Sequence, residues 1–574
     1  MPDRTLPDDL PTTETAANAI IRALQENDTE CIFAIPGGAV TPLLFAADDN
    51  GLRVVVTRHE TGAAFVAMGY AQVGRRLGVC AVTAGPGATN AITGIAAAMH
   101  DSAPVVLLTG QVATSAYGRG AFQDSSPIGP LDITGLYEHV TKRSVLLPDA
   151  GRAHDIAQHL IREALSARQG PVQLSVPTNL AVSRVPTATS PARAIREARP
   201  SVDGAIMRTI ARELTAARCP AILAGHGVYV ADACEALRAV AERFEVPVAT
   251  TPKGKGVFPE EHPLSLGVFG FGGPTPAESY LLDEKVDLLV VVGTSLGEFQ
   301  TRGYHSGLGA DRTVVQIDID PAVIGRTYRA EIAVNADARA ALETLVAVGA
   351  TGLEPPERFW AQRPAAVIAQ APPAGDGLSP KEAVGAVCEL LPGDALFFVD
   401  IGNCMGLASD CHRVRQTGTY FVGLGLGSMG YAGPASIGAK LARPDRPVVA
   451  LMGDGAFAMT GMEIHTAVDN DVPVVWVVLN NSGHGMVHTG ELAVFGDSKP
   501  WNLFGRPLDI ATVAAGLGAS VHTAETIEDV RAAMCDGLAA GVPTVIDVRV
   551  DADETPALVM QRSEDMRARI TVSG

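Results

Sequence analysis

Two buried strands near the end of the sequence each finish in polar residues that could bind a metal. One apolar run ends at Gly453-Asp454-Gly455 and the next, after 24 further residues, ends at Asn480-Asn481. Ligands of open α/β sheets bind at the carboxyl ends of strands, so we expect both turns to face one place. Asp454, Asn481 and the backbone carbonyl of Gly483 offer the oxygen ligands that Mg²⁺ takes beside phosphate oxygens. A lone Gly-Asp-Gly is also an ordinary turn, and its spacing to Asn-Asn makes the pattern specific.

In this spacing the chain resembles the thiamine diphosphate (ThDP)-dependent 2-oxoacid decarboxylases and carboligases, most closely the acetolactate synthases. The resemblance extends from Asn480 to Val487, where His484 replaces the usual Gln; read alone, His484 is also a solvated loop histidine. It implies that Asp454, Asn481 and Gly483 hold Mg²⁺. The other residues of this stretch that it assigns to the cofactor are Gly453, Gly455, Ala456, His484, Gly485 and Met486.

The segment Gly425–Gly430 reads G-x-G-x-x-G and admits two interpretations. It could bind a dinucleotide, but the acid expected after the next strand is missing, because Asp445 lies in a Pro-rich turn. The similar segment of ThDP enzymes is a loop whose methionine packs under the cofactor, so the resemblance assigns Gly427 and Met429 to the cofactor. Met429 alone would also suit an ordinary core position.

The turn Gly402-Asn403-Cys404 stands where similar enzymes carry Gly-Gln-His beside the diphosphate. Asn403 can donate to a phosphate oxygen, whereas a thiol is a weak donor and replaces histidine poorly. The resemblance places Asn403 and Cys404 at the cofactor. From the residues alone, Cys404 is either a packed small residue or a reactive thiol.

Glu60 opens a helix after the apolar run Arg53–Val56. A carboxylate in the first turn of a helix ordinarily compensates the helix dipole. The similar RHE segment of ThDP enzymes implies another role, in which Glu60 shares a proton with N1′ of the aminopyrimidine ring and so helps the 4′-amino group to remove the C2 proton. Pro86 lies in the Gly-rich turn Thr83–Asn90, which is similar to the GPGATN loop of the family, and is assigned to the cofactor as well.

The segment Gly120–Asp124 (GAFQD) resembles the GAFQE segment of acetolactate synthases, with Asp124 in place of Glu. The resemblance implies that Phe122 and Gln123 line the substrate pocket and belong with Glu60 to the catalytic residues.

Two departures from the family pattern concern the second substrate and flavin. Gly490 stands where acetolactate synthases have a tryptophan that shapes the choice of acceptor, which leaves the acceptor open. The biosynthetic branch carries FAD near an RFDDR segment, and Gly293–Arg302 lacks that segment. FAD therefore stays uncertain and is not favoured.

Short apolar runs alternate with Ala-rich helical segments, which is typical of parallel sheets covered by helices. We predict an α/β fold of three consecutive parallel-sheet domains: a pyrimidine-binding domain at 12–185, a central domain at 200–352 and a diphosphate-binding domain at 377–550, before a tail at 551–574. The Pro-rich stretches 185–200 and 352–377 read as linkers. The predicted strands are 53–56, 78–82, 104–108, 171–176, 221–224, 246–249, 287–292, 314–319, 395–399, 420–422, 447–452, 473–479 and 543–548.

Composition excludes several classes of protein. The 574 residues are 47% hydrophobic, enough for sizeable cores, and the net charge of −19 disfavours binding to nucleic acid. The 8 cysteines form no CxxC pair, which argues against a zinc site or a disulfide framework. No apolar run reaches the roughly 18 residues of a membrane span, and the first residues lack the apolar core of a signal peptide. We expect a cytoplasmic protein.

The resemblance implies an enzyme that decarboxylates a 2-oxoacid, with pyruvate expected, and transfers the acyl-anion equivalent to a second carbonyl compound. An alternative is a decarboxylase or C–C lyase whose cycle ends in protonation. The joint presence of Glu60, Asp454 and Asn481 argues against a non-catalytic binding protein. The resemblance also implies a homo-oligomer, a dimer or a dimer of dimers, in which Glu60 of one subunit meets Asp454 of another.

Overall fold

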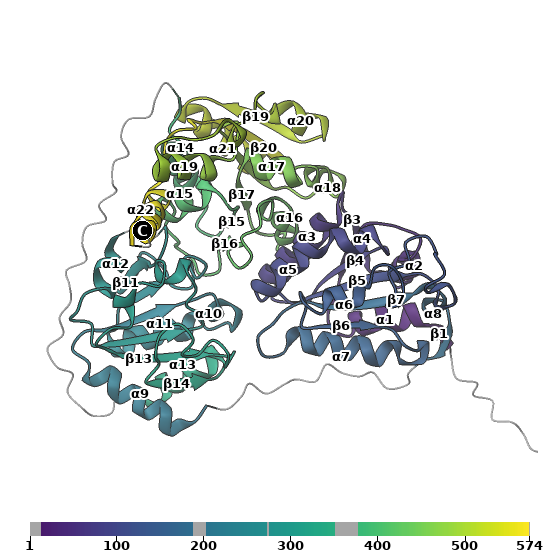
Figure 1. Ribbon diagram of the computed structural model, residues 1–574, viewed down its shortest axis with the longest axis horizontal. Coiled ribbons are helices and arrows are strands. Elements are labelled where there is room, and N and C mark those ends of the chain that lie inside the picture. Colours follow the sequence, from purple (N-terminus) through teal and green to yellow (C-terminus); the bar gives the residue numbers. More distant parts are fainter. Residues whose placement is uncertain (1–12, 188–201, 273–274, 350–376, 573–574) are drawn as a thin grey trace, which may run out of the picture. The chain divides into compact units, whose positions relative to one another are not determined.

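The computed structural model describes residues 13–187, 202–272, 275–349 and 377–572, and the chain divides into two compact units between residues 197 and 198 (Figure 1). The first unit holds one six-stranded sheet and the second holds two, and all strand pairs within these sheets are parallel. The predicted α/β fold of three parallel-sheet domains is confirmed. Most of both predicted linkers lies outside the described residues.

The sheet of the first unit has the strand order β3-β2-β4-β5-β7-β6. The elements of this unit are β1 (Thr13–Thr15), α1 (Ala16–Gln25), β2 (Cys31–Ala34), α2 (Thr41–Asp49), β3 (Arg53–Val56), α3 (Glu60–Gly74), β4 (Gly78–Val82), α4 (Pro86–Asn90), α5 (Ile92–His100), β5 (Val105–Gln111), α6 (Ile133–Tyr137), β6 (Arg143–Leu146), α7 (Ala153–Leu165), β7 (Val172–Pro177), α8 (Thr178–Ala181) and β8 (Arg184–Pro186). Strands β4 and β5 are buried along their whole length, because α3 and α5 cover one face of the sheet and α1 and α7 cover the other (Figure 1).

The central sheet has the order β11-β10-β9-β12-β13-β14. Its elements are α9 (Gly204–Ala216), β9 (Pro220–Ala224), α10 (Gly227–Val230), α11 (Cys234–Phe244), β10 (Val248–Thr250), β11 (Ser265–Val268), α12 (Thr275–Leu281), β12 (Leu288–Val292), β13 (Thr313–Asp318), β14 (Ile332–Asn335) and α13 (Ala338–Val348). Its middle strands β9 and β12 are again apolar and fully buried.

The third sheet has the order β16-β15-β17-β18-β20-β19. Its elements are α14 (Pro380–Leu390), β15 (Leu396–Val399), α15 (Asn403–Cys411), β16 (Tyr420–Val422), α16 (Ala432–Ala442), β17 (Val448–Gly453), α17 (Asp454–Thr460), α18 (Glu463–Asp469), β18 (Val475–Asn480), α19 (Gly485–Phe495), η5 (Pro500–Asn502), α20 (Ile510–Gly516), β19 (Ser520–Ala524), α21 (Ile527–Ala540), β20 (Thr544–Arg549) and α22 (Ala557–Val572). The predicted tail is α22, which packs against α19 and α15.

The first and third sheets share one topology. Numbered along the chain, the strands of both follow the order 2-1-3-4-6-5, whereas the central sheet follows 3-2-1-4-5-6. In the shared order, the first and third strands are neighbours. The chain leaves the first strand toward the second on one side and the third strand toward the fourth on the other side. Open α/β sheets bind their ligands at such a point, which places the expected sites beyond β2 and β4 and beyond β15 and β17.

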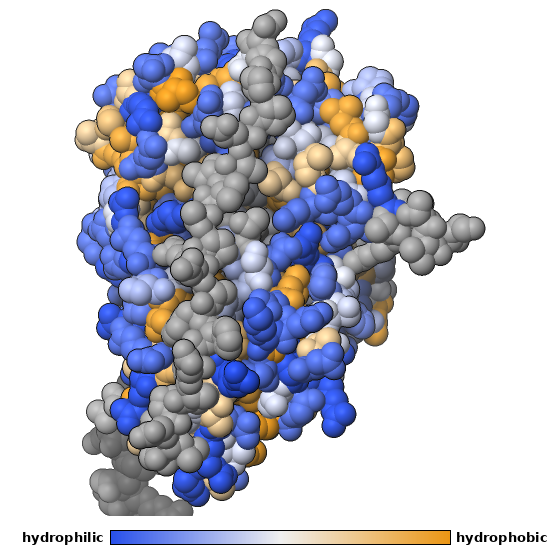
Figure 2. All heavy atoms as spheres, turned by 90° about the vertical axis from the view of Figure 1, so that its left-hand side faces the viewer, coloured by the Kyte–Doolittle hydropathy of each residue, from blue (hydrophilic) through white to orange (hydrophobic). Residues whose placement is uncertain are grey.

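The face of the molecule in Figure 2 is mostly hydrophilic, and its hydrophobic side chains lie in separate groups. This agrees with the net charge of −19. Among the described residues, no helix has both the length and the apolar character that a membrane crossing requires.

Candidate functional site

Asp454 lies at the carboxyl end of β17, the third strand of its sheet, and is 1% exposed. The turn predicted at Gly453–Gly455 is instead the start of a helix, because α17 begins at Asp454 itself; a second helix, α18, follows at Glu463. The Asp454 carboxylate accepts the backbone N–H of Gly455 at 2.8 Å and that of Gly483 at 2.9 Å. Two strand ends are thereby held together through one side chain.

Two further oxygen atoms converge on this carboxylate, which makes three in all. The side-chain oxygen of Asn481 lies 3.2 Å from Asp454 Oδ1 and 3.0 Å from the carbonyl oxygen of Gly483, and turning the amide over would place its NH₂ there instead. Neighbouring ligands of an octahedral Mg²⁺ lie about 3 Å apart, since each is about 2.1 Å from the ion. The side-chain amide of Asn481 therefore lies at about this spacing from both of the other predicted ligands, Asp454 and Gly483.

The charge of the site comes from a single carboxylate. Burial raises the pKa of Asp454 to about 6, although the backbone N–H groups of Gly483 and Gly455 oppose the shift. A buried anion is stabilised by a cation beside it. Within the described ranges, no group of three or more His, Cys, Asp or Glu side chains could hold a metal, so a search for clusters of such residues alone would not find this site.

A segment that the sequence reasoning missed holds Gly483 in place. Gly483 forms an isolated antiparallel bridge with Leu503, His484 N–H donates to Asn502 O at 2.8 Å, and Phe504 N–H donates to Ser482 O at 2.7 Å. A Cβ atom on Gly483 would lie 2.4 Å from Asn502 O. No motif in 502–504 signals this role, because it consists of backbone pairing.

Met429 and His484 both lie against the first turn of α17. A Cβ atom on Gly455 would come within 2.9 Å of His484 Nδ1 and 3.2 Å of Met429 Cε. His484 also packs edge-on against Phe504 with ring centroids 5.6 Å apart, so it is not simply a solvated loop residue. Gly427 has a φ of +74°, and a Cβ atom there would meet nothing within 4 Å, which leaves its backbone open to a ligand.

The starts of α15 and α19 lie side by side. Asn403 begins α15, and its Nδ2 lies 3.4 Å from Thr489 Oγ1 and 3.2 Å from the position of a Cβ atom on Gly485, the first residue of α19. Two helix N-termini that lie together favour an anion such as a diphosphate. The next residue along α19 is Met486, which packs partly buried against the core of this sheet.

Cys404 is a buried packing residue, 3% exposed, with its thiol 3.2 Å from the backbone carbonyl of Asp400. Burial, aided by the charge of Asp400, raises the pKa of the Cys404 thiol well above its ordinary value. A thiol held in this neutral form is a poor nucleophile, and of the two interpretations of Cys404 the structure favours the packed residue.

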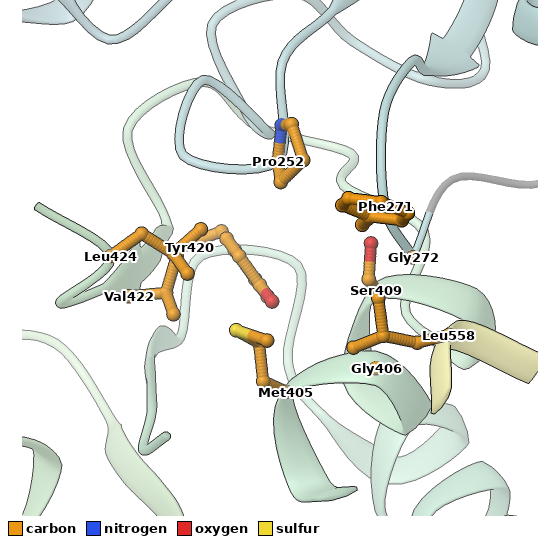
Figure 3. Close-up of a pocket in the computed structure, with 10 residues that line it drawn as sticks. All are labelled: Pro252, Phe271, Gly272, Met405, Gly406, Ser409, Tyr420, Val422, Leu424 and Leu558. Carbon is orange, nitrogen blue, oxygen red and sulfur yellow. The ribbon is translucent and has the colours of Figure 1, made fainter. Parts of the chain in front are cut away.

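A small hollow beside α15 is not this site. Figure 3 shows a small pocket between Pro252 and Phe271 on one side and Met405, Ser409 and Tyr420 on the other. Its volume is about 10 Å³, about that of one water molecule. It contains none of the predicted site residues.

In the first unit, Glu60 is the first residue of α3 and is half-buried. His59 caps the helix by accepting the N–H of Thr61 at 3.1 Å, which leaves the Glu60 carboxylate free for other partners. Asn90 donates to Glu60 Oε2 at 3.0 Å. The role of Asn90 is a second point that the sequence reasoning missed, although the residue lies in the Gly-rich turn.

The Gly-rich turn brings Glu60 near the predicted substrate residues. A Cβ atom on Gly87 would lie 3.4 Å from Glu60 Oε1, and one on Gly85 would lie 3.1 Å from the Cβ of Gln123. Gly85 has a φ of +61° and Gln123 has a φ of +62°, so the tight contact rests on unusual backbone at both residues. Glu60 and Gln123 thus flank one turn, on which the exposed Pro86 begins α4.

Phe122 points away from this unit and is 88% exposed. Its loop is ordered by Asp124, which accepts the N–H of Gly118 at 2.8 Å and that of Ser126 at 3.1 Å. Exposed large apolar side chains on an ordered loop are typical of surfaces that another part or partner covers. Described by itself, the first unit brings Gln123 but not Phe122 toward Glu60.

Comparisons with known proteins find a related binding domain in each of the two units. Three family models of thiamine pyrophosphate (TPP) enzymes match the chain one after another. The N-terminal TPP binding domain matches residues 14–128, the central domain 207–345 and the C-terminal TPP binding domain 400–548. Thiamine pyrophosphate is another name for ThDP.

Curated relatives match over almost the whole chain. A probable acetolactate synthase large subunit of Methanocaldococcus jannaschii is 31% identical, covering 95% of this chain and 93% of its own length. An acetolactate synthase of Mycobacterium bovis is 33% identical over 94% of this chain and 88% of its own. The isozyme 1 large subunit of Escherichia coli acetolactate synthase is 30% identical, covering 94% of both chains.

Proposed function

Since this chain belongs to the thiamine pyrophosphate enzymes and is an enzyme of the acetolactate synthase type, we propose that it decarboxylates pyruvate and joins the resulting two-carbon unit to a second carbonyl compound. The observation that carries the proposal is the meeting of Asp454, Asn481 and the Gly483 carbonyl at the distances of Mg²⁺ ligands. The names of the relatives support the carboligase outcome over simple decarboxylation.

The residues of the third sheet fit the diphosphate end of ThDP with Mg²⁺. Asp454, Asn481 and the Gly483 carbonyl would hold the ion, and the N-termini of α15 and α19 at Asn403 and Gly485 would face the phosphates. Met429 and His484 would lie at the turn beyond Gly455. Bound there, ThDP supplies the carbanion chemistry that amino acid side chains lack.

Glu60 would do the chemistry that the first unit contributes. Its carboxylate would hold a proton against the ring nitrogen N1′, and the hydrogen bond from Asn90 would keep it pointed there. Gln123, beside the same turn, would bind the substrate, and Phe122 would close the pocket from a neighbouring surface. Neither substrate role is needed for ThDP to bind.

Product analysis tests the reaction. Incubation with pyruvate, ThDP and Mg²⁺ should release carbon dioxide and give acetolactate or another condensation product. Acetaldehyde as the sole organic product would show instead that the cycle ends in protonation. If pyruvate is not consumed and ThDP does not bind, the proposal is wrong at its base.

We infer further that the enzyme is a homo-oligomer in which Glu60 and Asp454 of one site come from different subunits. The exposed Phe122, beside the turn that carries Glu60, supports a covered surface there. Mixing two inactive variants, Glu60→Gln and Asp454→Asn, tests this under subunit exchange. Hybrids should regain activity, because one site of each pair then holds two intact residues; no recovery in exchanged hybrids contradicts the shared site.

We also infer that the central domain works without flavin. At its switch point between β9 and β12, Gly225 N–H donates to Val292 O at 2.8 Å and Gly227 N–H donates to Gly293 O at 2.9 Å. A Cβ atom on Gly225 would lie 2.4 Å from Gly293 O. The N–H groups that a dinucleotide would use are therefore already paired within the protein. Analysis of the cofactors released on denaturation tests this: ThDP without flavin is expected, and FAD in stoichiometric amount would contradict it.

A further inference from the structure

Asp400 is a buried carboxylate that the proposed reaction does not use. It directly follows β15, the strand next to β17, and is 0% exposed. Its Oδ1 accepts the N–H of Ile401 at 2.8 Å and that of Gly430 at 2.9 Å, and its Oδ2 accepts the N–H of Ala432 at 2.8 Å. Both oxygens are therefore occupied by backbone donors.

This arrangement is costly to the fold, and so it calls for a reason. Burial raises the pKa of Asp400 to about 6, although the three backbone hydrogen bonds oppose the shift. A buried carboxylate is favoured over a neutral side chain only where several donors need an acceptor at once. An asparagine has one acceptor oxygen, and its NH₂ would face an N–H donor at the position of the other oxygen.

Two of the three donors that Asp400 binds, Gly430 and Ala432, closely follow the loop position of Met429. Gly430 forms hydrogen bonds through both of its backbone groups: its N–H donates to Asp400, and its carbonyl accepts the hydroxyl of Thr460 at 2.9 Å. Gly430 has a φ of +82°, and a Cβ atom there would lie 2.8 Å from Thr460 Cγ2. The loop is thus fixed between the end of β15 and α17, the helix that begins at Asp454.

Asp400 also reaches the second group of predicted cofactor residues. Its backbone carbonyl lies 3.2 Å from the thiol of Cys404, in the first turn of α15, next to Asn403. A single residue therefore connects the Met429 loop with the start of the helix that would face the diphosphate.

We propose that Asp400 is a positioning residue for the cofactor: it fixes the Met429 loop and the start of α15 in one geometry relative to Asp454. This inference rests on the proposed ThDP site and adds a residue that touches neither the cofactor nor the metal ligands. The chemical requirement is an acceptor at both oxygen positions, which explains a carboxylate in the core.

The test replaces Asp400 by asparagine in the full-length protein. Asp400→Asn should weaken the binding of ThDP at saturating Mg²⁺ about tenfold, as expected when a positioned contact is displaced, measured by titration calorimetry. The matched control is Glu463→Gln, a change at another buried acid of the same domain, which is 2% exposed, begins α18 and accepts the hydroxyl of Thr466. That control should lower the melting temperature and leave the affinity for ThDP unchanged.

A second variant keeps the test open if Asp400→Asn does not fold. Thr460→Val removes the hydrogen bond from the Thr460 hydroxyl to the Gly430 carbonyl. It should also weaken ThDP binding, by a smaller factor than Asp400→Asn. If both variants melt earlier yet bind ThDP as the wild type does, Asp400 is only structural and the inference is wrong. If the wild type itself does not bind ThDP, the proposed function fails instead.

Discussion

The first and third sheets have the same strand order and yet present their acids in opposite ways. Glu60 follows the second strand of its sheet, is half-buried and receives one side-chain hydrogen bond, from Asn90. Asp454 follows the third strand, is 1% exposed and is bound by two backbone N–H groups. The same strand order thus carries one acid that is partly exposed and one that is buried and held by the backbone.

The difference follows from what surrounds each strand end. The turn after β3 is closed by a histidine cap, so the carboxylate of Glu60 is spared from helix capping. The turn after β17 meets a second strand end at Gly483, and both oxygens of Asp454 are used in the junction. The shared strand order therefore fixes where an acid stands, and the local partners decide whether its oxygens stay accessible or are bound by the backbone.

The largest expected effect comes from removing the proposed proton-sharing carboxylate, Glu60. Glu60→Gln keeps the shape and the hydrogen bond of the side chain but cannot share its proton, so kcat should fall about 1,000-fold while the affinity for ThDP changes little. Steady-state kinetics and calorimetry measure the two quantities. The exposed Glu138→Gln is the control in the same unit, and full activity of Glu60→Gln would refute the assignment.

The second prediction concerns Asp454, the proposed carboxylate ligand of Mg²⁺. Asp454→Asn removes the only carboxylate among the three converging oxygens, so the affinity for ThDP with Mg²⁺ should fall at least about 100-fold. Titration calorimetry measures it, with the exposed Asp445→Asn as the control. An unchanged affinity would show that the ion is held elsewhere.

The third prediction concerns the extra acid of the third sheet. Asp400 follows the first strand, where the first sheet has Ile35, and its pKa is raised from 3.8 to about 6. The folded state therefore binds the proton more tightly than the unfolded state. The resulting stability is complete below about pH 4 and is lost as the pH rises through 6, about 3 kcal/mol in total.

The comparison of wild type with Asp400→Asn isolates this term, because the other titrating groups cancel in the difference. The free energy of unfolding of the wild type, minus that of the variant, should fall between pH 4 and pH 7. Urea unfolding of the cofactor-free proteins measures it, and a difference that is flat with pH would contradict the raised pKa of Asp400.

The smallest effect sharpens the description of Glu60. Asn90→Leu removes the hydrogen bond to the carboxylate, and kcat should fall about tenfold with ThDP affinity unchanged, since a hydrogen bond to a charged group contributes about 1.5 kcal/mol or more. Thr89→Val, one position earlier in the same turn, serves as the control. A loss of ThDP affinity equal to the loss of kcat would show that Asn90 orders the turn rather than the acid.

The sequence alone predicts the interior of the three sheets well. Each predicted strand is present in the structure, because an apolar run covered on both faces leaves a plain signal. Strands β6, β11, β14 and β19 were not predicted, and all four lie at sheet edges, where one side chain in two can be polar. The inner strand β2 is only four residues long and was also missed.

The candidate site divides in the same manner. The nearness of Asp454 and Asn481 could be predicted, because side-chain chemistry and spacing mark these two residues, and Gly483 follows in the same turn. The segment 502–504 and the hydrogen bonds of Asp400 could not, because they act through backbone groups that any residue type carries. The role of Phe122 also stays a prediction, since its partner surface is not part of the first unit.

The bridge between Gly483 and Leu503 brings a tryptophan close to the turn that carries the predicted metal ligands. Trp501, two residues before Leu503, is 73% exposed, whereas Trp476 is 1% exposed within β18. Indole fluorescence responds to solvent and to nearby charge, so a shift of the Gly483 carbonyl toward a cation should be carried through Asn502 to Trp501. We therefore expect the emission of Trp501 to change when ThDP and Mg²⁺ are added.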